Sequence, residues 1–248
     1  MSASPRALVE QFESAPSLPR GSDERFDGYG VMGLPFASGH VLAMRRFPAS
    51  SIGPGYTSVW HRTPDRRWVF YATVPPRQAC ARFFGAAVSG AIETEIGVTW
   101  TGAHRLRITV PAVALAWDVS VGPTIATRIM NAAGRLMPPA AWRSPAVLSG
   151  VGVLAGPLLG AGRVRMQGRV PNGQRFVANP RLLWAVTESR AVLSGEDFGQ
   201  PGSLHPQARL GDFWIPQRGM LAIGQAFFEP FDPELHSSRL SESQVDSL

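Results

Sequence analysis

The sequence contains no lysine, and this absence excludes several kinds of chemistry. All 24 basic residues are arginine. Without an ε-amino group the chain cannot form a Schiff base, anchor pyridoxal phosphate or place a Walker-type lysine on a phosphate. Arginine in place of lysine throughout indicates a compositional bias, and the net charge of +6 in part reflects it. The arginines are dispersed with no basic run, so we expect no nucleic-acid partner.

Cysteine and clustered histidine are also scarce. The single cysteine, Cys80, cannot form an internal disulfide, so a reducing, cytoplasmic location is expected. The N-terminus lacks the apolar segment of a secretory signal. The histidines are far apart and lack the spacing of a metal site, and we expect neither metal nor cofactor. They are His40, His61, His104, His205 and His236.

The length and the apolar content allow a full core, and the pattern predicts one large β-rich domain. Residues 1–27 are expected to be a peripheral segment with a short helix over 5–13. Residues 28–235 are predicted to form the β domain with a helical insertion at 124–161. The polar tail 236–248 is expected to be disordered. Nothing in the sequence settles the oligomeric state.

The clearest strand pattern covers residues 91–121. Apolar and polar residues alternate over three successive segments with tight connections, which is typical of an antiparallel meander. About nine to eleven strands can be counted along the chain. This number suits a closed or nearly closed antiparallel β-barrel better than a sandwich, with two fused half-barrels as the alternative.

Residues 124–161 interrupt the strands. Thr124 is a helix cap for the segment up to Leu136, and Ser144-Pro145 predicts the start of a second helix. No charged residue occurs between Arg143 and Arg163, but glycine and proline interrupt the run, so stable membrane insertion is not expected. The segment 144–162 is interpreted as a core helix packed across a sheet, with a lid or a membrane-contacting element as alternatives.

Two hairpins have predictable turns. In the first, we expect Arg62 opposite Arg67 across the turn 63–66, which places His61 opposite Trp68. One face would then carry Val59, His61, Trp68 and Phe70. In the second, a three-residue loop, Pro171-Asn172-Gly173, with Gly173 in the left-handed region pairs Val170 with Gln174.

His61 is the first candidate catalytic residue, because an imidazole inside an apolar barrel could act as general acid or base. Asp118 and Glu188 are the candidate carboxylates, since burial would raise their pKa. The simpler interpretations are a satisfied core histidine and solvent-exposed carboxylates. Aromatic residues on the strands are primarily core but could line a cavity for an apolar ligand. These are Tyr56, Trp60, Trp68, Tyr71, Trp100, Trp117 and Trp184.

The arginines at 45, 46, 165, 169 and 175 form a third group. One of them at a barrel mouth could hold a ligand carboxylate or phosphate with two hydrogen bonds. Solvated strand faces explain most of them more simply.

The overall plan resembles lipocalin-like (calycin) proteins of the carotenoid hydratase and hydroxyneurosporene synthase type. The shared features are aromatic-rich antiparallel strands, the Trp60-His61 dipeptide and the spaced glycines Gly162 and Gly168 before a hairpin. Such proteins are usually longer, with two complete barrels, and lack this apolar helical insertion. The resemblance implies a pocket for a hydrophobic small molecule and, in some members, cofactor-free acid/base chemistry. No catalytic residue is transferred, because no diagnostic motif aligns.

The leading hypothesis is therefore a lipocalin-like barrel that binds an isoprenoid, polyketide or lipid-like molecule, with 124–161 as its lid. A variant adds hydratase, isomerase or cyclase chemistry by His61 with a carboxylate. The alternative is a non-catalytic structural or protein-interaction barrel whose core is filled by its own tryptophans.

Overall fold

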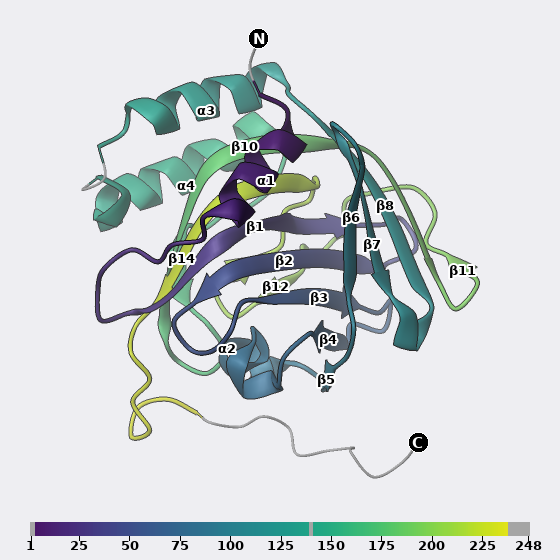
Figure 1. Cartoon of the computed structure of the whole chain (residues 1–248), viewed down its shortest axis with the longest axis horizontal. Helices are drawn as coiled ribbons and strands as arrows, with labels where there is room; N and C mark the ends of the chain where they lie inside the picture. Colours follow the sequence, from purple (N-terminus) through teal and green to yellow (C-terminus); the bar gives the residue numbers. More distant parts are fainter. Residues whose placement is uncertain (1–2, 139–140, 238–248) are drawn as a thin grey trace.

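The computed structural model describes residues 3–138 and 141–237, and it is built on one large curled sheet (Figure 1). The main path of this sheet contains ten strands. Their order is β5 (Gly90–Glu93), β4 (Trp68–Ala72), β3 (Tyr56–Arg62), β2 (Val41–Ser50), β1 (Glu24–Pro35), β14 (Met220–Phe228), β10 (Arg175–Leu193), β8 (Leu115–Gly122), β7 (Arg105–Val110) and β6 (Gly97–Gly102). Short strands β9 (Gln167–Arg169) and β11 (Glu196–Asp197) pair with β10, and β12 (Arg209–Leu210) pairs with β13 (Phe213–Trp214).

The sheet curls so far that its two edges approach each other. Strands β5 and β6 are the opposite ends of the path, yet only residues 94–96 join them. A connection of this length spans roughly 14 Å at most. In Figure 1, β6–β8 accordingly cross in front of β1–β4. The predicted mainly β, barrel-like fold is confirmed, as a half-barrel whose sheet is mixed because β4 and β5 pair in parallel.

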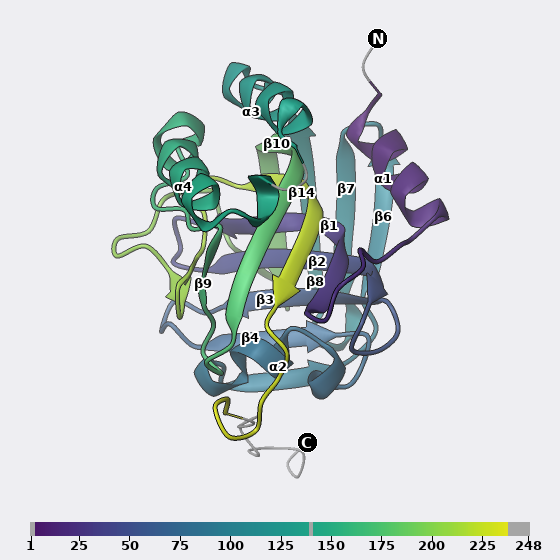
Figure 2. The same cartoon turned by 90° about the vertical axis from the view of Figure 1, so that its left-hand side faces the viewer.

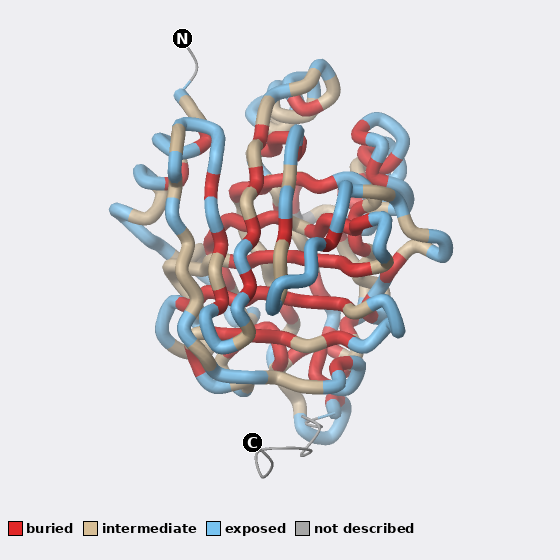
Figure 3. The backbone as a smooth tube through the Cα atoms, turned by 90° about the vertical axis from the view of Figure 1, so that its right-hand side faces the viewer, coloured by how far each residue is buried: buried red, intermediate tan, exposed pale blue. Residues whose placement is uncertain are grey.

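The meander is confirmed with one change. Strands β6, β7 and β8 pair antiparallel in sequence, and the apolar residues of β7 and β8 are buried as predicted. The strand expected to begin at 91 is broken, since β5 ends at Glu93 and β6 begins at Gly97 on the other edge. Figure 3 shows that the strands carry most of the buried residues and that the connecting loops are exposed.

The register of the first hairpin differs from the prediction. Thr63 pairs with Arg67 across the three-residue loop Pro64-Asp65-Arg66, with Arg66 in the left-handed region at φ 68°. Arg62 therefore lies opposite Trp68, and His61 lies opposite Val69. Because side chains alternate along a strand, this shift of one residue moves Trp68 and Phe70 to the face of Trp60. The predicted grouping of His61 with those two residues is wrong.

The second hairpin was predicted correctly. Gly173 has φ 99°, Val170 pairs with Gln174, and Gly168 lies opposite Phe176. The same loop type thus occurs in both hairpins. Gly173 signals it in one, whereas arginine occupies the left-handed position in the other and gives no such signal.

The inner side of the curled sheet, where β1–β4 face β6–β8, is a packed apolar core. Its cluster includes Leu42 and Met44 of β2, Ile108 of β7, and Trp117 of β8. Trp117 is fully buried and its indole N–H donates to Ser189 Oγ at 2.9 Å. The interior expected to be a ligand chamber is therefore occupied by the side chains of this core. A second cluster covers the outer side of β2–β4.

The helices pack against the sheet from both of its sides. They are α1 (Pro5–Ser14), α2 (Ala81–Phe84), α3 (Ile125–Leu136) and α4 (Pro145–Leu159), with short 3-10 turns η1 (Pro76–Gln78), η2 (Gly85–Ala87), η3 (Pro111–Val113) and η4 (Ala141–Arg143). Figure 2 shows α3 and α4 beside β10 and β14. Thr124 caps α3 and Pro145 opens α4 as predicted. Within the described residues, no helix combines the length and apolar character needed to cross a membrane.

Helix α4 is half-buried, as the core-helix interpretation predicts. Leu148, Ala155 and Leu159 are buried in a third cluster with Leu183 and Met220 of the sheet. At the N-terminus, Val9 of α1 is fully buried in the inner core, and β1 begins at Glu24, inside the segment expected to be peripheral. The predicted disordered tail lies outside the described residues, apart from His236 and Ser237.

Candidate functional site

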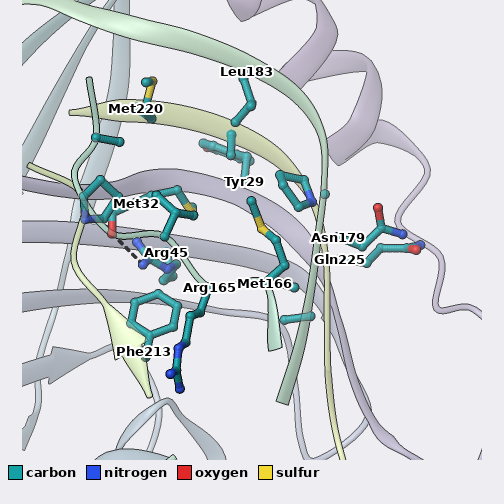
Figure 4. A pocket seen from close by; sticks show the side chains of 18 of the residues that line it. Tyr29, Met32, Arg45, Arg165, Met166, Asn179, Leu183, Phe213, Met220 and Gln225 are labelled. Atoms are coloured by element: carbon teal, nitrogen blue, oxygen red, sulfur yellow. Dashed lines mark hydrogen bonds between the residues drawn. The ribbon is translucent and has the colours of Figure 1, made fainter. Parts of the chain in front are cut away.

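A cavity of about 150 Å³ lies on the outer side of the sheet, between the central strands and the chain that follows α4 (Figure 4). Its floor comes from β1, β14 and β10, and its walls come from residues 159–166 and 213–216. The lining is mainly apolar and includes Met32, Phe47, Leu159, Val164, Met166, Leu183, Phe213, Met220, Ala222 and Ala226. Of the inner core cluster, only Tyr29 also lines this cavity.

Arg45 is the charged residue buried at this cavity. Strand β2 alternates, so Arg45 shares a face with Val41, Ala43 and Phe47, and its side chain is directed outward into the second cluster. Only 5% of Arg45 is exposed. Its guanidinium carbon lies 4.8 Å from the ring centre of Trp60 and 5.7 Å from that of Phe213. The cation is thus held against aromatic faces, where its attraction to the π-systems partly offsets the loss of water.

Backbone carbonyls hold the guanidinium in place. Nη1 donates to the carbonyls of Val31 at 2.6 Å and Met44 at 3.0 Å, and Nη2 donates to the carbonyl of Met32 at 2.9 Å. Val31 lies at the edge of the β1–β2 register shift and Met32 lies within it. An arginine has five N–H donors, and two of them have no hydrogen-bond partner among the described residues.

No carboxylate of the described residues pairs with Arg45. Burial lowers the pKa of Arg45 to about 10, and Cys80 and Tyr56 oppose part of this shift. At this value the guanidinium remains protonated at neutral pH. The protein therefore keeps an uncompensated positive charge in an apolar site, which is costly unless a partner neutralises it.

Tyr56 and Cys80 lie beside the guanidinium in a smaller adjoining cavity of about 50 Å³. Tyr56 Oη and Cys80 Sγ are 3.3 Å apart and both side chains are buried. Burial raises the pKa of the Tyr56 hydroxyl and of the Cys80 thiol, so both groups are neutral and neither supplies a counter-charge. The two groups can donate or accept hydrogen bonds next to Arg45.

Two glycines keep the floor of the larger cavity open. Gly28 of β1 lies opposite Gly224 of β14. A Cβ atom on Gly28 would lie 2.1 Å from the Arg46 carbonyl oxygen, and one on Gly224 would lie 2.2 Å from the Asn179 carbonyl oxygen. Only glycine allows the neighbouring backbones to approach this closely. The same two residues line the cavity.

The size and lining of the cavity define what it can hold. A cavity of this volume accommodates a molecule of about the size of benzene. Its apolar walls favour an apolar body, and the free N–H groups of Arg45 favour an anionic group that accepts two hydrogen bonds.

His61 is buried on the inner face of β3, away from this cavity. Its Nε2 lies 2.9 Å from Nδ1 of His40, and both rings stack near Phe198. His40 Nε2 also approaches Glu196 Oε1 at 3.4 Å. Burial and, to a smaller extent, His40 lower the pKa of His61 to about 4, so His61 is neutral at pH 7.

The two predicted carboxylates lie elsewhere. Asp118 accepts two hydrogen bonds of 2.8 Å from Arg107, which lies directly opposite on β7 and holds the pKa of that carboxyl below its usual range. Glu188 is exposed on β10 at 3.5 Å from Arg105. No hydrogen bond or ion pair between described residues joins any two of His61, Asp118 and Glu188. The structure therefore does not assemble these three into one site.

The predicted aromatic residues divide between the two faces. Tyr56 and Trp60 line the smaller cavity, and Trp68 packs in the same outer cluster. Tyr71, Trp117 and Trp184 belong to the inner core, and Trp100 packs against it. The sequence pattern missed most of the cavity lining, since Met32, Leu183 and Met220 look like ordinary core residues. The available signal was Arg45 itself, a charge on the otherwise apolar face of its strand.

The described part of the chain contains no group of three or more His, Cys, Asp or Glu side chains placed to bind a metal. No family model matches the sequence, and no curated protein is significantly similar to it.

Solved structures give distant likenesses only. Acetoacetate decarboxylase from Legionella pneumophila superposes with a TM-score of 0.40 and 8% identity, over 93% of this chain and 94% of that chain. A second acetoacetate decarboxylase structure gives 0.39 and 10%, over 88% and 90%. These scores are too low to assign a family or an activity. None of the comparisons shows the carotenoid hydratase type.

Proposed function

We propose that the protein binds a small carboxylic acid with an apolar body of about benzene's size, its carboxylate resting on Arg45. The uncompensated charge of Arg45 at the apolar cavity is the observation that carries this proposal. A carboxylate suits the site because it matches the planar donors of a guanidinium and adds no polar group beyond the two that are needed. The neutral hydroxyl of Tyr56 and thiol of Cys80 line the smaller cavity together with Arg45 and can add hydrogen bonds to the same anion.

The proposed function is ligand binding without catalysis. Acid/base chemistry would require a group that titrates near neutral pH beside the ligand. His61 lies on the opposite face of its strand, and burial raises the pKa of both Tyr56 and Cys80. The proposal therefore assigns no catalytic role to His61, Asp118 or Glu188. The self-filled core of the alternative hypothesis describes the inner side of the sheet, whereas the ligand site lies on its outer side.

Titration calorimetry with benzoate, benzamide and benzyl alcohol tests the proposal on the unaltered protein. The three molecules have similar bodies, but only benzoate carries a charge. We expect benzoate to bind at least about thirtyfold more tightly, because a desolvated charge pair is worth 2 kcal/mol or more. Equal binding of all three molecules would contradict the proposed role of Arg45. If none of them bound, the proposed ligand site would be contradicted.

The substitution Arg45→Lys keeps the charge but loses the planar pair of donors, and we expect about tenfold weaker benzoate binding or worse. Arg46→Lys is the matched control, since Arg46 is the next residue of β2, is directed to the opposite face and pairs with Glu13 at 3.2 Å. It should leave benzoate affinity unchanged. Native mass spectrometry of the purified protein would identify an acid that co-purifies.

A further inference from the structure

Helices α3 and α4 carry most of the exposed large apolar side chains of the described residues. Eight such side chains are exposed among the described residues, and six of them belong to these two helices. They are Ile125, Ile129 and Leu136 on α3, and Val153, Leu154 and Leu158 on α4. Ile125 and Leu136 are 80% and 84% exposed. A monomeric protein seldom exposes so many large apolar groups together without a binding role.

Each of the two helices also has a second apolar face, which packs against the protein. The residues of α3 at 125, 129 and 136 recur at helical spacing on one side, while Thr127 and Met130 face the protein. On α4, Leu154 and Leu158 lie one turn apart, and Leu148, Ala155 and Leu159 fill the third cluster. Both helices thus have an inner apolar face that is satisfied and an outer apolar face that is not.

The segment that contains both helices carries charge of one sign, although the exposed Asp23 lines the same groove as Arg135. No aspartate or glutamate occurs between Asp118 and Glu188, whereas eight arginines do. Arg128 and Arg135 lie on α3 beside its apolar stripe and are exposed. Neither has an ion-pair partner among the described residues, and α4 itself carries no charge. An apolar helix face bordered by unpaired arginines complements the surface of an anionic membrane, where apolar groups enter the acyl boundary and cations meet phosphate.

We infer that the outer face of α3 and α4 docks onto the surface of an anionic lipid membrane. A second copy of the chain fits this face less well, because a symmetric contact of α3 and α4 with themselves would offer Arg128 and Arg135 no carboxylate from either helix. The inference does not rest on the carboxylate site, because none of the six exposed side chains lines that cavity, although Leu159 at the end of α4 does. Binding of benzoate and binding of membranes can therefore be measured separately.

Co-sedimentation with phosphatidylcholine vesicles, with and without phosphatidylglycerol, tests the inference. We expect binding to vesicles that contain phosphatidylglycerol, with weaker binding as salt is added. The double substitution Arg128→Gln/Arg135→Gln should weaken it by about fivefold per arginine. Arg77→Gln is the matched control, because Arg77 is also exposed but lies in η1, far along the chain from both helices.

The apolar contribution needs its own pair of variants. Ile129→Ser/Leu154→Ser should weaken vesicle binding at least about tenfold, since two apolar groups no longer enter the membrane. Ile92→Ser/Leu235→Ser alters two exposed apolar residues outside α3 and α4 and should have no effect. All four residues are exposed, so unchanged melting temperatures would show that folding is intact. The inference would be overturned if vesicle binding were unchanged in both Arg128→Gln/Arg135→Gln and Ile129→Ser/Leu154→Ser. A dimer in solution that buries this face in place of lipid would also overturn it.

Discussion

His40 and His61 share a single hydrogen bond in the inner core, with Nδ1 of His40 2.9 Å from Nε2 of His61. One ring nitrogen must donate and the other must accept, so the bond exists only while the accepting ring is neutral. Both residues are 4% exposed, and their rings stack near Phe198. Protonation of the accepting ring would place a charge in this core and leave two donors facing each other.

Burial of His61 and, to a smaller extent, its neighbour His40 are expected to make the stability of the protein depend on pH. The pKa of His61 falls from 6.5 to about 4 on folding, so the unfolded chain binds the proton more readily. The stabilisation is fully present above pH 6.5, and about 3 kcal/mol of it is lost as pH falls to 4. In the His61→Gln variant, this dependence of the unfolding free energy on pH should disappear when urea unfolding is measured across the same pH range. His104→Gln, at an exposed turn, should keep it.

Asp27 is expected to act in the opposite direction. Burial raises the pKa of this carboxyl from 3.8 to about 6, although Arg181 and Gln225 lower it in part. The folded state holds the proton more tightly, so stability is greatest below pH 3.8 and is lost as pH rises through about 6. Asp27→Asn should therefore raise the free energy of unfolding at pH 7 by about 2 kcal/mol, allowing for solvent screening. Asp23→Asn, which is exposed nearby, should not.

His61 and Asp27 titrate over overlapping pH ranges and affect stability with opposite signs. Their contributions to the free energy of unfolding should therefore nearly cancel between pH 4 and 6 in the unaltered protein. Each single variant should reveal the contribution of the other group. A protein whose stability falls steeply in that range, and does so equally in both variants, would contradict the assignment.

Gly28→Ala is expected to destabilise the sheet by about 2 kcal/mol or more. The added methyl group would lie 2.1 Å from the Arg46 carbonyl oxygen, and the central strands cannot separate to make room without losing their own hydrogen bonds. Gly150→Ala is the matched control, since nothing lies within 4 Å and the residue is inside α4. This change should stabilise by up to about 1 kcal/mol. Denaturant midpoints of the two variants give the comparison.

Cys80 is expected to react slowly with thiol reagents in the folded protein. It is 6% exposed and burial raises the pKa of its thiol, so little thiolate is present. Labelling with dithiobis-nitrobenzoate at mildly alkaline pH should proceed at the rate of local opening, while the urea-unfolded chain should react at once. Immediate labelling of the folded protein would show that the cavity beside Tyr56 is open to solvent.

The sequence alone determined the mainly β architecture, because alternating side chains in β7 and β8 can bury one face only as strands. It also determined the helical excursion, since Thr124 and Pro145 mark helix starts by local chemistry. The hairpin at Gly173 followed from the preference of glycine for a left-handed conformation.

Only the tertiary structure decided which face of each strand is inner or outer. The loop with Arg66 in the left-handed region shifted one register by a single residue, and this moved Trp68 and Phe70 away from His61. The pairing of His61 with His40 and the burial of Arg45 against Trp60 depend on contacts between strands and loops whose registers local sequence does not specify. Position along the chain gives the residues available for a site, while the curl of the sheet decides which of them meet.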